Sequence, residues 1–378
     1  MTPLVLLSGG TGDSDFFYAT GFQVENAAYI RFAGGDDLLV VPRLELERAR
    51  ETSRVAKVVD RDELGWEEME DFGVAWSHVV ARALRERGVS EVLVSPRLYV
   101  TYAEGLAAEG IATRVERRLF LDQRRRKSRD EAAAIQAAQH AAEAACSEVI
   151  AQLGVAEAVD GVLQLDRRPL TSERLFAEAN AALNQIGYST PEMIIAGAPA
   201  NAIPHARGSG PIRAGAPVII DIFPRGNTSH YHGDLTRTVV VGEIGEEVRK
   251  MHAAVVAALE AAIEQIRPGV NGRDVHRTAC RVLVEHGFGT TTAGYEGHQA
   301  GPIMTHSLGH GVGLDVHEAP YLRELDMPLA EGDVLTVEPG LYDRRLGGVR
   351  VEDTGIVTAD GFRNFTSLSR ALDPRAYL

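Results

Sequence analysis

Three histidines lie within twelve residues of one glycine-rich segment, His306–Pro320, which reads HSLGHGVGLDVHEAP. They are His306, His310 and His317. Neutral imidazoles bind metal ions and transfer protons near pH 7, and glycine allows the backbone to approach a ligand closely. A loop with solvated surface histidines is the alternative. Three histidines at this density, with acidic residues on either side in the sequence, favour a site for metal binding or proton transfer.

Four acidic residues stand at the ends of apolar runs: Asp221, Asp234, Glu338 and Glu352. Each acid alone is more often a cap or a turn residue. Burying four negative charges together costs a prohibitive free energy unless cations neutralise them. Together with His310 they form an oxygen-rich set of ligands, which suits Mn²⁺ or Co²⁺ better than a structural thiolate zinc site. Four carboxylates are too many for one ion. We therefore expect two ions about 3.5–4 Å apart that share bridging carboxylates, an arrangement used for hydrolysis.

Predicted strands position these acids. Asp221 ends the apolar run VIID, and Asp234 begins DLTRTVVV. If the residues between them form a hairpin connection, the two carboxylates emerge side by side at its mouth. Glu352 lies in a strand predicted over 349–357, in which the alternation of side chains places it on the same face as Arg350.

Residues 1–122 predict a small α/β domain without a cluster of catalytic residue types. Strands are predicted at 4–7, 28–32, 37–42 and 91–95. A helix is predicted from 66 to 87 and ends at Gly88. We expect this domain to serve packing or assembly.

Residues 123–378 form the second predicted domain. The basic run Arg124–Lys127 is interpreted as a solvated linker in preference to a phosphate-binding patch. Ser128 and Glu131 form a capping box that starts a long alanine-rich helix. Further helices are predicted at 171–186, 246–266 and 273–286, and strands at 193–196, 217–222, 236–241, 333–338 and 349–357. A helix pair followed by a hairpin thus occurs twice, which predicts two related halves that share a central sheet.

Composition excludes several classes of function. The formal net charge of −14 repels a phosphate backbone, so nucleic acid is not an expected partner. The N-terminal stretch lacks the basic region of a signal peptide, and no apolar run has the length of a membrane span. Cys146 and Cys280 make no metal-type spacing and are interpreted as buried thiols in a reducing cytoplasm.

The five predicted ligands, in this order along the chain, resemble the ligand set of the pita-bread metallopeptidases, which include methionine aminopeptidase, aminopeptidase P and prolidase. The motifs HSLGHGVGLDVHEAP, VLTVEPGLY, GGVRVEDT and DLTRT are similar to those of the proline-specific branch, as is NAIPH at 201–205. The resemblance implies an α+β protein, with an N-terminal creatinase-like α/β domain over 1–122 and a pita-bread catalytic domain of two related halves over 123–378.

The resemblance also implies how the metal ions are held. One ion is bound by Asp221, the other by His310 and Glu338, and both are bridged by Asp234 and Glu352. Mn²⁺ is the expected ion, with Co²⁺ or Zn²⁺ as alternatives. A homodimer is expected on the same ground.

Other residues receive roles from the resemblance alone. His205 and His317 contact the substrate and stabilise the tetrahedral oxyanion, and His306 shapes the pocket. Arg350 orients the bridging acid beside it. Glu338 passes a proton to the leaving proline nitrogen, which carries no hydrogen in the peptide.

Two features depart from the family pattern. Asp221 and Asp234 are thirteen residues apart, so the connection FPRGNTSHYHG is longer than usual. His230 and His232 lie in this connection and are interpreted as solvated loop residues in preference to extra site residues. Pro191 stands where relatives often have an aromatic residue. Both departures concern the substrate pocket and leave the metal ligands unchanged.

The resemblance implies a metal-dependent hydrolase that cuts the Xaa-Pro bond at a free N-terminus of dipeptides or oligopeptides. Chain length and motifs favour an Xaa-Pro dipeptidase, with an aminopeptidase P as the alternative. A dipeptidase must recognise a free α-carboxylate, and Arg323 is a candidate for this task; pairing with Glu324 or Asp326 is its alternative role. A non-catalytic binding module and a metal-free creatinase-like hydrolase are disfavoured because all five ligands are present.

Overall fold

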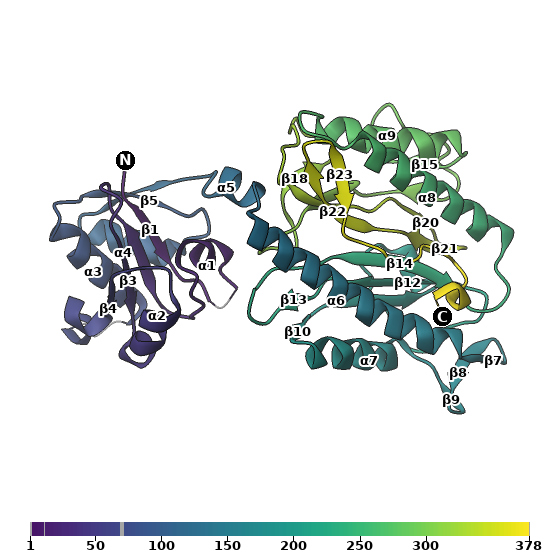
Figure 1. The fold of residues 1–378 in the computed structure, drawn as a ribbon, viewed down its shortest axis with the longest axis horizontal. Coiled ribbons are helices and arrows are strands. Elements are labelled where there is room, and N and C mark those ends of the chain that lie inside the picture. Colours follow the sequence, from purple (N-terminus) through teal and green to yellow (C-terminus); the bar gives the residue numbers. More distant parts are fainter. Residues whose placement is uncertain (1, 11, 69–71, 378) are drawn as a thin grey trace. The chain divides into compact units, whose positions relative to one another are not determined.

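The computed structural model describes residues 2–10, 12–68 and 72–377 (Figure 1). The chain divides into two compact units, Met1–Leu121 and Asp122–Leu378. Each unit has hydrophobic clusters of its own.

The first unit is built on a six-stranded mixed sheet with the strand order β4-β3-β2-β1-β5-β6. Its strands are β1 (Leu4–Leu7), β2 (Ala28–Arg31), β3 (Asp37–Val41), β4 (Val58–Asp60), β5 (Glu91–Val94) and β6 (Ala112–Val115). Alternate residues of a strand face opposite sides of a sheet. Leu4 and Leu6 therefore pack with α1 (Ser14–Thr20) and α2 (Leu46–Thr52), while Val5 and Leu7 pack with α3 (Phe72–Arg85) and α4 (Val100–Ala108).

Only part of the helix expected over 66–87 is described as an α-helix. A 3-10 turn covers Trp66–Glu68, and α3 begins at Phe72 and ends at Arg85. Residues 69–71 of the expected helix lie outside the described part of the chain. Gly88 has a φ of +67°, a conformation that glycine adopts without steric cost, and it follows the helix as expected.

Helix α5 (Leu121–Arg125) starts at the last residue of the first unit, and the long helix α6 (Arg129–Gly154) follows it in the second unit. The Ser128 side chain accepts a bond from the Glu131 amide, and Glu131 accepts one from the Ser128 amide, so the predicted capping box is present. The prediction of a solvated linker before it is wrong. The side chains of Arg124, Arg125 and Lys127 are only 10%, 13% and 2% exposed, and each forms an ion pair with a buried carboxylate, that of Glu318 or Asp333.

The first half of this unit contains an antiparallel sheet of three strands, β11 (Met193–Gly197), β12 (Pro217–Ile222) and β14 (Leu235–Val240). Helices α6 and α7 (Ser172–Gln185) cover one face of it. Short strands accompany these elements: β7 (Glu157–Val159), β8 (Val162–Leu165), β9 (Arg168–Pro169), β10 (Tyr188–Ser189) and β13 (Arg225–Gly226).

The second half repeats the helix pair with α8 (Glu246–Gln265) and α9 (Gly272–Glu285). Nine strands follow: β15 (Gly289–Thr290), β16 (Ile303–Met304), β17 (Gly309–Gly311), β18 (Glu318–Leu322), β19 (Val334–Val337), β20 (Gly340–Asp343), β21 (Gly347–Arg350), β22 (Asp353–Thr358) and β23 (Gly361–Asn364). They form a sheet ordered β15-β16-β20-β21 and another ordered β18-β17-β19-β22-β23. In Figure 1 the strands lie between two helix pairs, α6 with α7 on one side and α8 with α9 on the other.

The single strand predicted over 349–357 is two strands in two sheets. Strand β21 pairs with β20, and β22 pairs with β19. Val351 and Glu352 lie between β21 and β22, where the chain crosses from one sheet to the other. At this crossing the Glu352 amide donates to the carbonyl of Thr236 on β14. The two halves are also joined by Thr238, whose hydroxyl bonds to the backbone of Arg350. The two halves were expected to share one central sheet. In the described structure their strands belong to separate sheets.

Among the described residues, no helix has both the length and the apolar character needed to cross a lipid bilayer. Cys146 and Cys280 are buried free thiols.

Candidate metal centre

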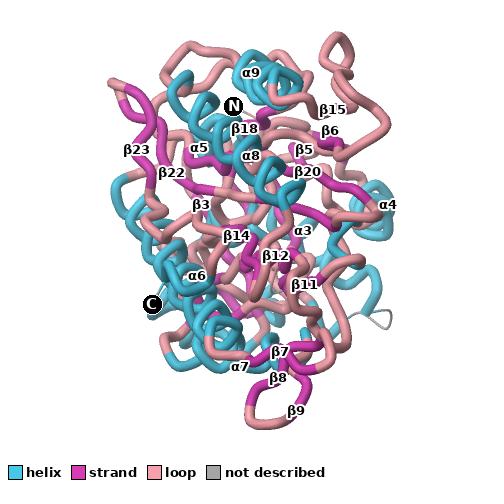
Figure 2. Tube along the Cα trace, turned by 90° about the vertical axis from the view of Figure 1, so that its right-hand side faces the viewer, coloured by secondary structure: helices cyan, strands magenta, loops and turns pink. Residues whose placement is uncertain are grey.

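Strand alternation sets the direction of the two aspartates. On β12, Ile220 and Ile222 pack against the helices, so Asp221 faces the opposite side with Ile219. Asp234 directly precedes β14, which lies beside β12. Figure 2 shows β11, β12 and β14 in the interior with α6 along their outer side. Strands β12 and β14 pair antiparallel, as the predicted hairpin requires, and this brings the carboxylates of Asp221 and Asp234 to one end of the sheet.

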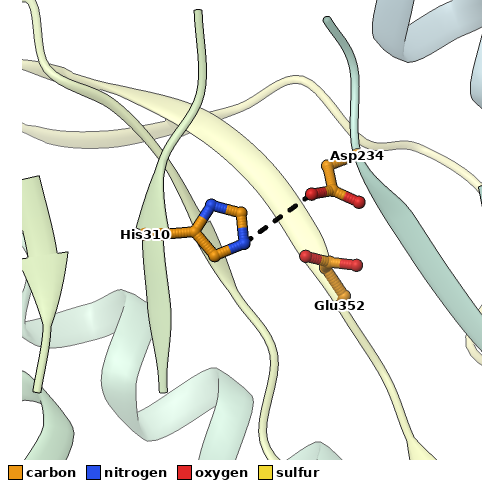
Figure 3. Close-up of side chains that lie close together, drawn as sticks. All are labelled: Asp234, His310 and Glu352. Carbon is orange, nitrogen blue, oxygen red and sulfur yellow. Dashed lines mark ion pairs between the residues drawn. The ribbon is translucent and has the colours of Figure 1, made fainter. Parts of the chain in front are cut away.

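The second half brings three further ligands to this end. His310 lies in the middle of β17, Glu338 directly follows β19, and Glu352 lies at the crossing between β21 and β22. One ligand atom each from Asp234, His310 and Glu352 lie within 4.8 Å of one another, and all three residues are buried. The His310 Nε2 is 3.7 Å from Asp234 Oδ2 and 3.4 Å from Glu338 Oε1. Figure 3 shows the imidazole facing the two carboxylates of Asp234 and Glu352.

The orientation of His310 suits a metal ligand. Its Nδ1 is 3.2 Å from the carbonyl oxygen of Gly311, which can only accept a hydrogen bond. This bond assigns a proton to Nδ1, so Nε2, which faces the carboxylates, is the nitrogen that would bind a metal ion. The backbone amide of His310 donates to the Thr336 hydroxyl at 3.2 Å, which fixes the residue on β17.

Hydrogen bonds from β14 and β21 orient the carboxylates. Arg350 donates to Asp221 Oδ2 at 2.5 Å, and Thr236 donates to Glu352 Oε2 at 2.8 Å. The expectation that Arg350 orients Glu352 is therefore wrong, because Glu352 has left the strand that carries Arg350. The other oxygen of Asp221, Oδ1, is buried and has no hydrogen-bond partner among the described residues. An unpaired buried carboxylate oxygen is an available ligand atom.

Electrostatics around the cluster also indicate a cation site. Burial and the charge of Asp221 raise the pKa of Asp234 well above its usual value, and burial and the charge of Asp234 do the same for Glu352. Burial would lower the pKa of His310, but its hydrogen bond and attraction to Glu338 raise it to about 9. Burial would raise the pKa of Glu338, but His310 lowers it to about 2. Protons therefore take the place that a metal ion would occupy, and the donor set fits divalent cations.

Three further histidines lie around the cluster. The His317 ring is edge-on to His310 with the ring centroids 4.2 Å apart, and His317 is exposed. His306 bonds through Nε2 to the Tyr342 hydroxyl at 2.9 Å, and Arg350 donates to the same hydroxyl at 2.8 Å. His205 is exposed. It lies close enough to His306 and His317 to contribute to the lowering of the pKa of each, although burial is the larger cause.

Arg323 is outside this group of contacts. It is exposed, and its guanidinium stacks on the Tyr321 ring at 4.6 Å. The alternative partners predicted for it are engaged elsewhere, since Glu324 pairs with Arg277 and Asp326 accepts from Asn271.

The interpretation of His230 and His232 as solvated loop residues is wrong. His230 is buried, and the Nδ1 of His232 is buried without a partner among the described residues. Burial lowers the pKa of each to about 4, so both are neutral at pH 7. The lengthened connection therefore packs its histidines inward, where the backbone amide of His232 donates to Gly313. Neither histidine is part of the metal-ligand group formed by Asp234, His310 and Glu352.

Sequence reasoning missed Thr236 and Tyr342. Thr236 lies in DLTRT two residues after Asp234, and strand alternation could have placed it on the same face. Tyr342 lies four residues after Glu338, and only the pairing of β20 with β21 brings its hydroxyl to Arg350.

Comparisons with known proteins agree with this geometry. The model of metallopeptidase family M24 matches residues 133–359, and the Creatinase/Prolidase N-terminal domain matches residues 6–116. The chain is 30% identical over 362 residues to the Xaa-Pro dipeptidase of Pyrococcus furiosus, covering 94% of this chain and 92% of that protein. It is 36% identical over 234 residues to Xaa-Pro aminopeptidase 1 of Streptomyces coelicolor, covering 55% and 47%.

A solved structure confirms the fold. The prolidase of Pyrococcus horikoshii superimposes with a TM-score of 0.80 at 26% identity, over 98% of this chain and 95% of that one. The predicted α+β fold, with a creatinase-type N-terminal domain and a pita-bread domain, is thus confirmed. The chain belongs to metallopeptidase family M24 and is a metal-dependent peptidase.

Proposed function

We propose that this protein is an Xaa-Pro dipeptidase that uses two divalent metal ions. The observation that carries the proposal is the convergence of four carboxylates and His310 at one end of the β12–β14 sheet, with an unpaired oxygen on Asp221. Four carboxylates exceed what one ion needs, so two ions sharing Asp234 and Glu352 account for the set. Mn²⁺ suits these oxygen-rich ligands, with Co²⁺ or Zn²⁺ as alternatives.

We assign the ligands as the family pattern places them. Asp221 would hold one ion, His310 and Glu338 the other, and Asp234 and Glu352 both. When bound, the ions would supply an activated water and polarise the scissile carbonyl. The protein fixes these ligands before binding, because Arg350 and Thr236 already orient Asp221 and Glu352.

Glu338 is the proposed carrier of the proton. Its carboxylate is 18% exposed at the side chain, so it borders both the ligand cluster and solvent. The nitrogen of an Xaa-Pro bond carries no hydrogen and must be protonated to leave. The carboxylate of Glu338 would take up a proton from water and pass it to this nitrogen.

His205 and His317 are the proposed substrate contacts. Both are exposed beside the buried ligands, and imidazole N–H groups at this place would stabilise the charge that develops on the carbonyl oxygen. His306 would shape the pocket, because Tyr342 links it to Arg350 and so to Asp221.

Preference for dipeptides is supported by the Xaa-Pro dipeptidases of two Pyrococcus species, each of which matches 94% of this chain. The aminopeptidase from Streptomyces coelicolor matches only 55% of this chain. Arg323 is retained as a candidate for binding the free α-carboxylate, although it stacks on Tyr321 in this structure. A homodimer, expected from the family resemblance, and a cytoplasmic location, expected from the two unpaired cysteines, complete the proposal.

The decisive experiment compares hydrolysis of Xaa-Pro and Xaa-Pro-Yaa peptides by protein loaded with Mn²⁺. A higher kcat/KM for the dipeptides supports the proposal. A preference for the longer peptides identifies an Xaa-Pro aminopeptidase, and no hydrolysis of either by metal-loaded protein contradicts a peptidase specific for proline.

A further inference from the structure

The basic segment that opens the second unit is bound to the loop that carries His317. Arg124 Nη2 is 2.9 Å from Asp315 Oδ2 and also contacts the carboxylate of Glu318. Lys127 Nζ is 2.6 Å from Glu318 Oε1. The side chains of Lys127 and Glu318 are 2% and 9% exposed, so this is an internal group of charges. We call Arg124, Lys127 and Glu318 the Glu318 clamp.

The loop is closed tightly around the Glu318 carboxylate. The amide of Asp315 donates to Glu318 Oε2 at 3.4 Å. A Cβ added to Gly313 would collide with all three atoms of the carboxylate, so only glycine leaves room for it. The carbonyl of Gly313 in turn accepts from the amide of His232 at 2.9 Å, which ties the loop to the connection before β14.

His317 depends on this loop for its position. Within the described part of the chain, its ring makes no hydrogen bond to the protein, and it lies edge-on to His310 with the ring centroids 4.2 Å apart. A side chain without polar anchors is placed by its backbone. The residue that follows it is Glu318, the first residue of β18 and the residue held by the clamp.

We propose that Arg124 and Lys127 are positioning residues for catalysis: by holding the carboxylate of Glu318 they place His317 beside His310 and the substrate. The inference rests on the proposed function, in which His317 contacts the substrate. Removal of one cation leaves a buried carboxylate partly uncompensated, and such a group moves toward water. A displacement of about 1 Å at a residue that orients the reaction costs on the order of 10²-fold in rate.

The test compares two methionine variants from the same basic segment. Lys127→Met breaks the clamp. Arg125→Met is the matched control, because Arg125 forms a similarly buried pair with Asp333 (2.6 Å; 13% and 0% exposed) and is not part of the Glu318 clamp. We expect both to lower Tm, but only Lys127→Met to lower kcat, by about 10–100-fold. KM should stay within about twofold and the bound metal unchanged, because no ligand and no uniform binding contact is removed.

Conservative changes separate the charge from the shape of the clamp. Lys127→Arg retains the cation and should recover most of the kcat. Glu318→Gln keeps the volume of the side chain, removes the charge held by both cations, and should lower kcat as Lys127→Met does. This variant also decides the question if Lys127→Met does not fold. A purely structural clamp would give equal kcat values for Lys127→Met and Arg125→Met at equal loss of Tm, and would overturn the inference.

Hydrogen exchange of the metal-loaded proteins gives a readout that does not depend on turnover. Residues 313–318 should exchange faster in Lys127→Met than in Arg125→Met, because only the first variant releases the loop. Equal exchange of this segment in both variants would overturn the inference. Wild-type protein without activity on Xaa-Pro peptides would contradict the proposed function, and the exchange result would still decide whether the clamp fixes the loop.

Discussion

Replacing Asp234 with asparagine should stabilise the metal-free protein although it removes a proposed ligand. Four carboxylates face His310 and Arg350, so the ionised cluster carries four negative and two positive charges, a net −2. Ligand atoms of Asp234 and Glu352 lie within 4.8 Å of each other. Two like charges at that separation repel by about 3 kcal/mol at an effective dielectric constant of about 20.

The pH dependence follows from the direction of the pKa shift. Burial raises the pKa of Asp234 in the folded state, so the folded protein holds more protons than the unfolded chain between the two pKa values. Stability therefore falls as the pH rises from about 4, the unfolded value, through the folded pKa. Protonation of Asp234 relieves the repulsion at low pH, so the gain from Asp234→Asn should be greatest at alkaline pH.

The assay is thermal unfolding at pH 8, with chelator and with saturating Mn²⁺. Without metal, Asp234→Asn should raise Tm by up to about 6–12 °C, since 1 kcal/mol corresponds to about 2–4 °C for a domain of this size. With metal the wild type should have the higher Tm, because it gains more free energy from metal binding than Asp234→Asn does.

Asp353→Asn is the matched control for this experiment. Asp353 is as buried as Asp234 but accepts from Arg237 at 3.0 Å and contacts Arg370. Breaking that pairing should cost about 3–5 kcal/mol with or without metal. If metal-free Asp234→Asn melts below the wild type at pH 8, as Asp353→Asn should, the cluster is not repulsive and the argument for a cation site is refuted.

The remaining predictions concern activity. Chelation should abolish peptide hydrolysis and added Mn²⁺ should restore it; metal-free protein, checked by elemental analysis, that retains full turnover would exclude the two-metal mechanism. His205→Ala and His317→Ala should keep their metal and lose activity by about 10²–10³-fold, whereas metal loss in step with activity would identify them as ligands. Arg323→Ala should raise KM for Xaa-Pro and hardly affect Xaa-Pro-Yaa, and an equal effect on both substrates would remove Arg323 from carboxylate recognition.

Hydrophobic pattern and local capping predicted the elements well. The capping box of Ser128, the helix pairs and the strands around Asp221 and Asp234 follow from side chains adjacent in sequence, where local physics decides. The strand over 349–357 was predicted wrongly because apolar alternation continues through Val351 while the hydrogen-bond partners change from β20 to β19. Partners far apart in sequence leave no trace in the local pattern.

The same limit explains the errors at the site. Arg350 and Glu352 are two residues apart, so a single strand would place them on the same face. Because the chain crosses between two strands there, Arg350 donates to Asp221 and Glu352 accepts from Thr236. Arg124 and Lys127 are typical of a solvated linker by composition, and their buried partner Glu318 is about 190 residues away in the chain. The ligand residues themselves could be identified, because their chemical types and order are specific even without their contacts.

The crossing at Val351–Glu352 has a mechanical consequence. Asp221 and Asp234 belong to the first half of the second unit, whereas His310, Glu338 and Glu352 belong to the second half. Ions bound as proposed would therefore act as cross-links between two lobes that are also joined by hydrogen bonds of Thr236, Thr238 and Arg237 and by the ion pair of Arg350 with Asp221. Metal loading would make the lobes melt as one cooperative body, and chelation would let one lobe loosen before the other.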